Sequence, residues 1–79
     1  MNMRELIDMV SRALVRNPDQ VDVREFDEEG TLVLELRCAQ EDAGRIIGRQ
    51  GRTIKAMRTL LHAAGIRGNV RVRLDLIEG

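Results

Sequence analysis

With 79 residues the chain has room for one hydrophobic core, so we expect a single domain over residues 1–79. The charges of its 13 basic and 13 acidic side chains cancel. Only 1% of the residues are aromatic, so the core must be aliphatic, and folds that stack bases on aromatic rings are disfavoured. Cys38 is the only cysteine, which excludes an internal disulfide. Charged residues interrupt residues 1–15, and every apolar run is too short to span a membrane. We therefore expect a cytoplasmic protein without a membrane segment.

The first half of the chain predicts one helix and a β-hairpin. Apolar residues recur three and four positions apart between Met3 and Leu14, which is the spacing of one helical face. Because proline disfavours helical backbone at the residue before it, Asn17-Pro18 should end this helix near Arg16. A strand over 21–26, a polar turn over 27–30 and a second strand should follow. Alternation in the second strand predicts a solvent-facing set, Val33, Glu35 and Arg37, and a core-facing set, Leu32, Leu34, Leu36 and Cys38.

The second half predicts two helices and a last strand. Glu41 and Asp42 stand where acids stabilise the positive end of a short helix, which continues through Ile47. A longer helix should begin at about Arg52 and end with Gly65 as its cap. Alternation over 70–76 predicts the last strand. In the longer helix the buried face should be Ile54, Met57, Leu61 and Ala64, and the exposed face Arg52, Lys55, Thr59 and His62.

The order of elements is therefore α-β-β-α-α-β. The hairpin strands should be antiparallel, whereas the strand–helix–helix–strand portion is a crossover whose two strands should be parallel. We expect an α+β domain of two layers: a three-stranded mixed sheet with one polar face, covered on the other face by three helices.

Charge is unevenly distributed along the chain. Residues 1–38 hold five basic and nine acidic side chains, and residues 39–79 hold eight and four. All eight of the latter basic residues lie between Ala43 and Leu74, where no acid occurs. Such asymmetry indicates a polyanionic partner, although two solvated faces without a partner would have the same pattern.

The loop Gly48-Arg49-Gln50-Gly51 is the strongest candidate site. Glycine allows another backbone to approach closely, so a phosphodiester chain could lie against this loop. The helix that follows points its unpaired N–H groups and positive end toward the same place. The cations Arg45, Arg49, Arg52 and Lys55 surround it.

The segment from Ile46 to Ile54 (IIGRQGRTI) resembles the signature of KH domains, in which the GxxG loop clamps about four backbone nucleotides. The element order resembles the type II KH arrangement. Essentially the whole chain, including Glu41-Asp42 before the loop, is similar to the KhpA family of small stand-alone bacterial KH proteins. The resemblance implies that Gly48, Arg49, Gln50 and Gly51 form a backbone clamp and that Ile47 contributes to the apolar floor of an RNA groove.

The same resemblance implies a non-enzymatic protein that binds single-stranded RNA. It also implies homodimers, a complex with the larger KH-domain protein KhpB (Jag), and a role in RNA chaperoning, post-transcriptional regulation and cell elongation. It leaves the RNA targets and the dimer surface undefined, because a loop that holds phosphates does not distinguish bases.

Other interpretations of these residues stay open. The glycines could serve a plain helix–helix turn, and His62, Arg71 and Arg73 could be ordinary solvated side chains. A small aliphatic domain could also act mainly as an adaptor that pairs with another KH protein. One His and one Cys on different elements make no defensible catalytic set, and the glycine spacing is not that of a Walker loop, so we expect no catalytic residue, metal or cofactor.

Overall fold

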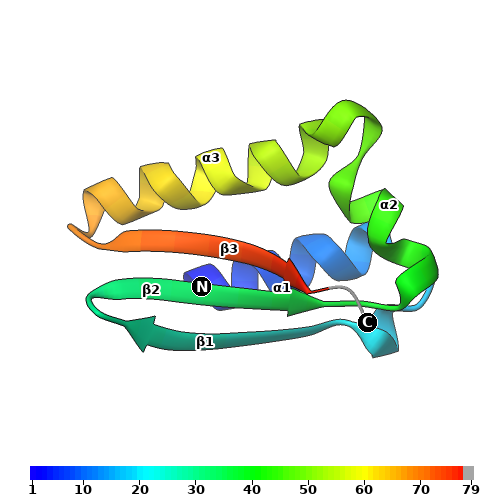
Figure 1. Ribbon diagram of the computed structural model, residues 1–79, viewed down its shortest axis with the longest axis horizontal. Helices are drawn as coiled ribbons and strands as arrows, with labels where there is room; N and C mark the ends of the chain where they lie inside the picture. The colour runs from blue at the N-terminus through cyan, green and yellow to red at the C-terminus, as the bar shows by residue number, and fades with distance from the viewer. Residues whose placement is uncertain (78–79) are drawn as a thin grey trace.

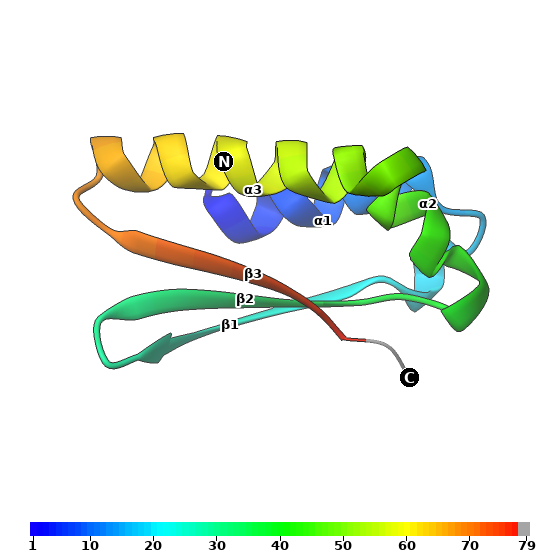
Figure 2. The ribbon, with the colours of Figure 1, turned by 45° about the horizontal axis from the view of Figure 1, so that its top comes forward.

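The computed structural model describes residues 1–77, and its helices and strands follow the predicted order (Figure 1). The helices lie together on one face of the sheet and leave the other face open (Figure 2). This confirms the α+β architecture of the type II KH arrangement, with a three-stranded mixed sheet. The elements are α1 (Met3–Leu14), β1 (Asp22–Glu28), β2 (Thr31–Arg37), α2 (Ala43–Ile47), α3 (Arg52–Arg67) and β3 (Arg71–Ile77), with short 3-10 helices η1 (Pro18–Gln20), η2 (Gln40–Asp42) and η3 (Arg49–Gly51).

The sheet has the strand order β1-β2-β3. β1 and β2 are antiparallel, whereas β2 and β3 are parallel with Leu34 opposite Leu74, as the crossover predicts. The hairpin turn is shorter than the predicted 27–30, because Glu28 pairs with Thr31 and only two residues join the strands. Those residues, Glu29 and Gly30, have φ of 51° and 86°, the left-handed backbone of a tight hairpin turn that matches strand twist.

The core between the sheet and the helices is aliphatic, as the composition predicts. Inward residues of β2 and β3, such as Leu34, Leu36 and Leu74, pack against the inner faces of the helices. The buried hydrophobic residues of this cluster are Ile7, Val21, Val23, Leu34, Leu36, Ile46, Ile54, Met57, Leu61 and Leu74.

Val33 contradicts the predicted exposure pattern. It lies on the open face of the sheet, yet its exposed fraction is 0%. The register places Phe26 on one side of it and Arg73 on the other, and the long side chains of cross-strand neighbours on the same face reach over a smaller residue. Ion pairs from Arg73 to Glu28 (3.2 Å) and Asp75 (3.1 Å) hold the arginine in place on that face. The prediction failed because it treated the open face as uniformly polar.

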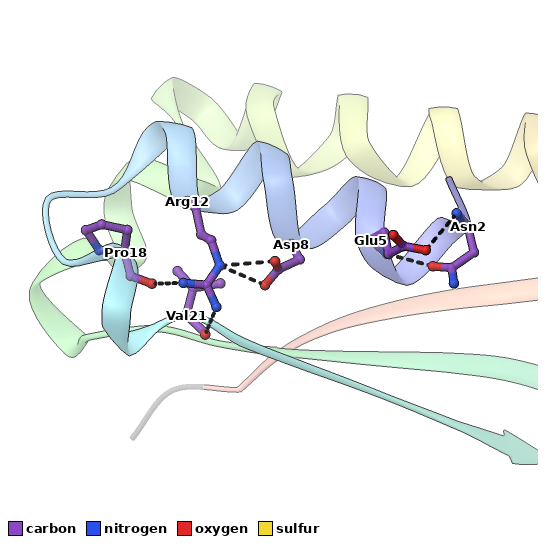
Figure 3. A network of polar contacts seen from close by, with 6 residues as sticks. All are labelled: Asn2, Glu5, Asp8, Arg12, Pro18 and Val21. Atoms are coloured by element: carbon purple, nitrogen blue, oxygen red, sulfur yellow. Dashed lines mark hydrogen bonds and ion pairs between the residues drawn. The ribbon is translucent and has the colours of Figure 1, made fainter.

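Helix α1 begins at a capping box and ends earlier than predicted. The Glu5 N–H donates to Asn2 Oδ1 (2.8 Å), and the Asn2 N–H donates back to the Glu5 carboxylate (Figure 3). The helix ends at Leu14 and not near Arg16, since Val15 already has extended backbone. The N–H groups of Arg16 and Asn17 donate instead to the carboxylate of Asp42, which draws the chain out of the helix.

Arg12 connects α1 to the start of β1 (Figure 3). Its Nε donates to the Asp8 carboxylate (3.0 Å), Nη1 to the Pro18 carbonyl and Nη2 to the Val21 carbonyl (2.6 and 3.0 Å). One guanidinium thereby satisfies the carbonyl of the first residue of η1 and that of the residue that follows η1, and fixes the path from the helix into the sheet.

Gly65 is not the helix cap that the sequence predicts. α3 continues to Arg67, and Gly68 is the capping residue. Gly65 is buried inside the helix, close to the chain that leads into β3. A β-carbon at this position would collide with the Val70 carbonyl, so the position requires glycine. β3 itself begins at Arg71, so Val70, which the prediction places in the strand, lies just before it. The glycine serves close packing of helix on strand and does not terminate the helix.

Candidate nucleic-acid interface

The loop between α2 and α3 reverses the chain through left-handed backbone. Gly48, Gln50 and Gly51 have φ of 77°, 57° and 73°. The Gly48 N–H donates to the Gly44 carbonyl (2.9 Å), and the Gly51 N–H donates to the Gly48 carbonyl (3.1 Å). These two bonds close the end of α2 and the turn η3, so the loop has a defined shape before any ligand is bound.

The two glycines are needed for different reasons. A β-carbon at Gly48 would collide with the side chain of Thr53 in the first turn of α3, so this glycine serves internal packing as well as its positive φ. A β-carbon at Gly51 would meet no heavy atom within 4 Å. Of the two, Gly51 is therefore the one that leaves open space for another backbone, whereas the sequence predicts such space at both.

Helix α3 begins at Arg52, as predicted. Gly51 precedes it, the Arg52 N–H donates to the Arg49 carbonyl and no side chain caps the helix start, so the positive end of a 16-residue helix lies beside the loop. Arg49, Gln50, Arg52 and Lys55 are exposed, and no ion pair among the described residues engages these three cations. The structure thus brings together the loop residues and two of the predicted neighbouring cations on α3.

Arg45 and Ile47 have more mixed environments. The Nε of Arg45 lies 3.8 Å from the Asp42 carboxylate, which draws part of its charge away from the loop. Ile47 is half-buried and packs against the core, so only part of its side chain is available beside the loop. Both lie on α2, on the opposite side of the loop from Arg52.

Asp42 holds the α2 side of this site to the rest of the fold. Its side chain is fully buried and accepts hydrogen bonds from the N–H groups of Arg16 (3.2 Å) and Asn17 (3.1 Å) and from the Asn17 side chain (3.0 Å). Burial alone would raise the pKa of Asp42, but these hydrogen bonds and Arg45 outweigh it and lower the pKa below its ordinary value. Asp42 stands at the N-terminal end of α2, as predicted, and its buried carboxylate also links that end to the segment that follows α1.

A groove runs between α3 and β3 from the loop toward the hairpin. Near the loop it holds a hollow of about 380 Å³, which has no acidic residue in its lining. A larger hollow of about 890 Å³ continues it to the hairpin turn and shares His62, Val72 and Arg73 with the first. The smaller hollow is lined by Lys55, Arg58, Thr59, His62, Val72, Arg73 and Leu74.

Arg58 is the groove residue that sequence reasoning missed. Its guanidinium donates from Nε and Nη2 to the Leu74 carbonyl of β3, at 3.2 and 3.1 Å. The signal that could have found it is its place three residues after Lys55, on the same side of a helix within the acid-free segment. Arg73 is less available, because its pairs with Glu28 and Asp75 raise the pKa of the guanidinium and hold it on the open face.

Within residues 1–77, no group of three or more His, Cys, Asp or Glu side chains gathers where it could hold a metal ion. No helix of that part of the chain is long and apolar enough to cross a membrane.

Comparison with known proteins identifies relatives over nearly the whole chain. A family model described as "KhpA/KhpB, KH domain" matches residues 4–76. The protein named RNA-binding protein KhpA of Clostridium acetobutylicum is 43% identical over 75 residues, which cover 95% of this chain and 100% of that protein. Proteins of the same name from Halalkalibacterium halodurans and Chlamydia pneumoniae are each 43% identical over 76 residues, covering 96% of this chain and 100% and 97% of theirs.

Proposed function

Since this chain belongs to the KhpA/KhpB family of KH domains, we propose that it binds single-stranded RNA by clamping the phosphate backbone at Gly48-Arg49-Gln50-Gly51. The names of its relatives support RNA as the ligand. The observation that carries the proposal is the conjunction of a preformed left-handed loop, an uncapped helix N-terminus and three unpaired exposed cations.

The proposed clamp works through backbone electrostatics. A phosphate at Gly51 would meet no side chain of that residue and would lie against the N–H groups at the start of α3. Arg49, Arg52 and Lys55 add positive charge, with Arg45 contributing less because of Asp42. Ile47 would provide apolar contact beside the loop, and the α3–β3 groove would take the bases. Residues 1–79 would act as a single, non-enzymatic KH domain without a cofactor.

A protein partner is a second part of the proposal. On α3, Leu60 and Ile66 are 58% and 68% exposed, and Leu60 borders a shallow hollow rimmed by Arg52 and Lys55. These residues support homodimers or pairing with a larger KH-domain protein of the KhpB (Jag) kind, the adaptor role. The broader role that we propose is that of a cytoplasmic RNA chaperone or post-transcriptional regulator linked to cell elongation. A strict monomer in light scattering over a concentration series would exclude the homodimer.

The double variant Arg49→Asp/Gln50→Asp tests the clamp. It places two negative charges on the proposed phosphate path, so we expect binding of a fluorescent U-tract RNA to weaken at least about tenfold at moderate salt. The slope of log affinity against log salt should also fall, by about 0.7 for each phosphate that the variant no longer binds.

The matched control is Gln20→Asp/Arg24→Asp, which makes the same change in net charge on exposed residues of η1 and β1. Circular dichroism and thermal melting establish that both variants fold. If the loop variant is folded and binds RNA as the wild type does, or if the control loses as much affinity, the clamp is in the wrong place.

A further inference from the structure

Arg58 makes an unusual contact at an edge of the sheet. β3 has β2 as its single neighbour, so alternate backbone groups of β3 face away from the sheet. Arg58 lies on α3, the helix that runs beside this strand, and two of its N–H groups converge on one β3 carbonyl, that of Leu74. A charged fork is therefore held in one orientation by a neutral acceptor of the backbone.

This contact uses one edge of the guanidinium and leaves another free. Arginine has five N–H donors, and the contact with Leu74 takes one from Nε and one from Nη2. Two N–H donors on Nη1 and one on Nη2 are left. One N–H on Nη1 and the one on Nη2 point in parallel, which suits two adjacent acceptors. No ion pair with a carboxylate of residues 1–77 engages Arg58, and its side chain lines the acid-free hollow of the groove.

The position of Arg58 suits a base and not the clamped phosphate. It lies six positions after Arg52 at the helix start, about 9 Å along the axis at 1.5 Å per residue. A nucleotide whose phosphate lies at the loop can therefore extend its base into the hollow between Arg58 and Val72. That hollow of about 380 Å³ is large enough for one nucleobase and is bordered by the apolar side chains Val72 and Leu74.

We propose that Arg58 is a specificity-determining residue whose free guanidinium edge recognises a base with two adjacent acceptors, guanine through O6 and N7 or cytosine through O2 and N3. The inference rests on the proposed RNA binding and adds a base preference to it. Bidentate pairing of arginine with O6 and N7 of guanine is the commonest specific contact of proteins with bases in the DNA major groove. Adenine and uracil offer an acceptor next to a donor at every comparable edge, and a donor would oppose the arginine N–H. The Leu74 carbonyl determines which edge of the fork is presented.

The test compares RNAs of sequence UUUNUUU, with N as each of the four bases, by fluorescence anisotropy. The wild type should prefer guanine or cytosine over uracil by about tenfold, within the range measured for bidentate arginine–base pairs. Arg58→Lys keeps the charge but lacks the fork, so it should reduce the preference to within about twofold. Replacing guanine with 7-deazaguanine should have the same effect on the guanine preference.

Arg67→Lys is the matched control, because Arg67 lies on the last turn of α3 outside the lining of both hollows and should keep the full preference. A purely structural Arg58 would lower the melting temperature of Arg58→Lys without changing the ratio between bases. Should Arg58→Lys fold poorly, the Nε–H resonance of Arg58 in the wild type should shift more with the guanine RNA than with the all-U RNA.

The outcomes separate this inference from the proposed function. Equal, salt-dependent binding of all four RNAs by the wild type would overturn the role of Arg58 and leave the clamp standing, as would a base preference that survives Arg58→Lys. Absence of binding to every RNA would overturn the proposed function, and the inference with it.

Discussion

The β1–β2 turn and the α2–α3 loop both reverse the chain with glycine and one other residue at positive φ, yet they differ in what surrounds them. Glu29 is part of the hairpin turn and Glu28 precedes it, and a β-carbon at Gly30 would meet nothing within 4 Å. The α2–α3 loop instead faces the start of α3 and exposed cations. The comparison teaches that left-handed backbone makes a turn, whereas a helix end and unpaired charge distinguish the loop that we propose as the binding site.

The largest effect should come from Gly48→Ala. The substitution combines positive φ with a collision against Thr53, so unfolding free energy should fall by about 2–4 kcal/mol. Urea denaturation measures it. Gly48→Ala/Thr53→Ala should recover only part of the loss, because the contact with Thr53 Oγ1 goes while the contact with the β-carbon of residue 53 and the strained φ stay. A loss below about 1 kcal/mol in the single variant would mean that the loop tolerates a side chain there.

Gly51→Ala and Gly30→Ala make a matched pair for the comparison. Both positions have positive φ and open space, so each substitution should cost about 1–2 kcal/mol of stability. RNA affinity should separate them: about tenfold weaker for Gly51→Ala, equivalent to about 1.4 kcal/mol, and unchanged for Gly30→Ala. Similar RNA affinities for the two variants would remove the distinction between the turns.

The smallest effect should be a dependence of the unfolding free energy on pH that comes from Asp42. Among residues 1–77, the hairpin turn has no such buried carboxylate beside it. The folded-state pKa of Asp42 is lowered, so its contribution to stability should be complete above the ordinary aspartate pKa of about 3.9 and lost as pH falls through the lowered value. Asp42→Asn lacks this titration. The difference in urea midpoint between the wild type and Asp42→Asn should therefore shrink between pH 6 and pH 3; a constant difference would contradict the assignment.

Periodic features of this fold were predictable from the sequence because they depend on local pattern. The order of helices and strands, the parallel β2–β3 pair and the start of α3 at Arg52 follow from alternation, helical spacing and the glycine loop. The roles of Gly65 and Val33 were not predictable in this way. Both depend on which residue of another element lies opposite, and that is determined by tertiary packing.

The candidate site was predictable to a similar degree. Its glycines and cations are recognisable by type and spacing. The different reasons why positions 48 and 51 need glycine depend on the neighbours that the fold gives each of them. The contacts of Arg58 and Asp42 were not predicted, for a common reason. Their partners are backbone groups 16 or more residues away, and a backbone carbonyl or N–H has no signature in the sequence.

The contact between Arg58 and Leu74 also bears on aggregation through the edge of the sheet. A sheet edge with free carbonyl groups is a template for strand addition by another chain, which leads to aggregation. On β3 the guanidinium already occupies the Leu74 acceptor, and α3 lies beside the same strand (Figure 1). A second sheet would have to break two hydrogen bonds and displace a charge to pair there. The arginine thus protects the β3 edge in a domain too small to bury it.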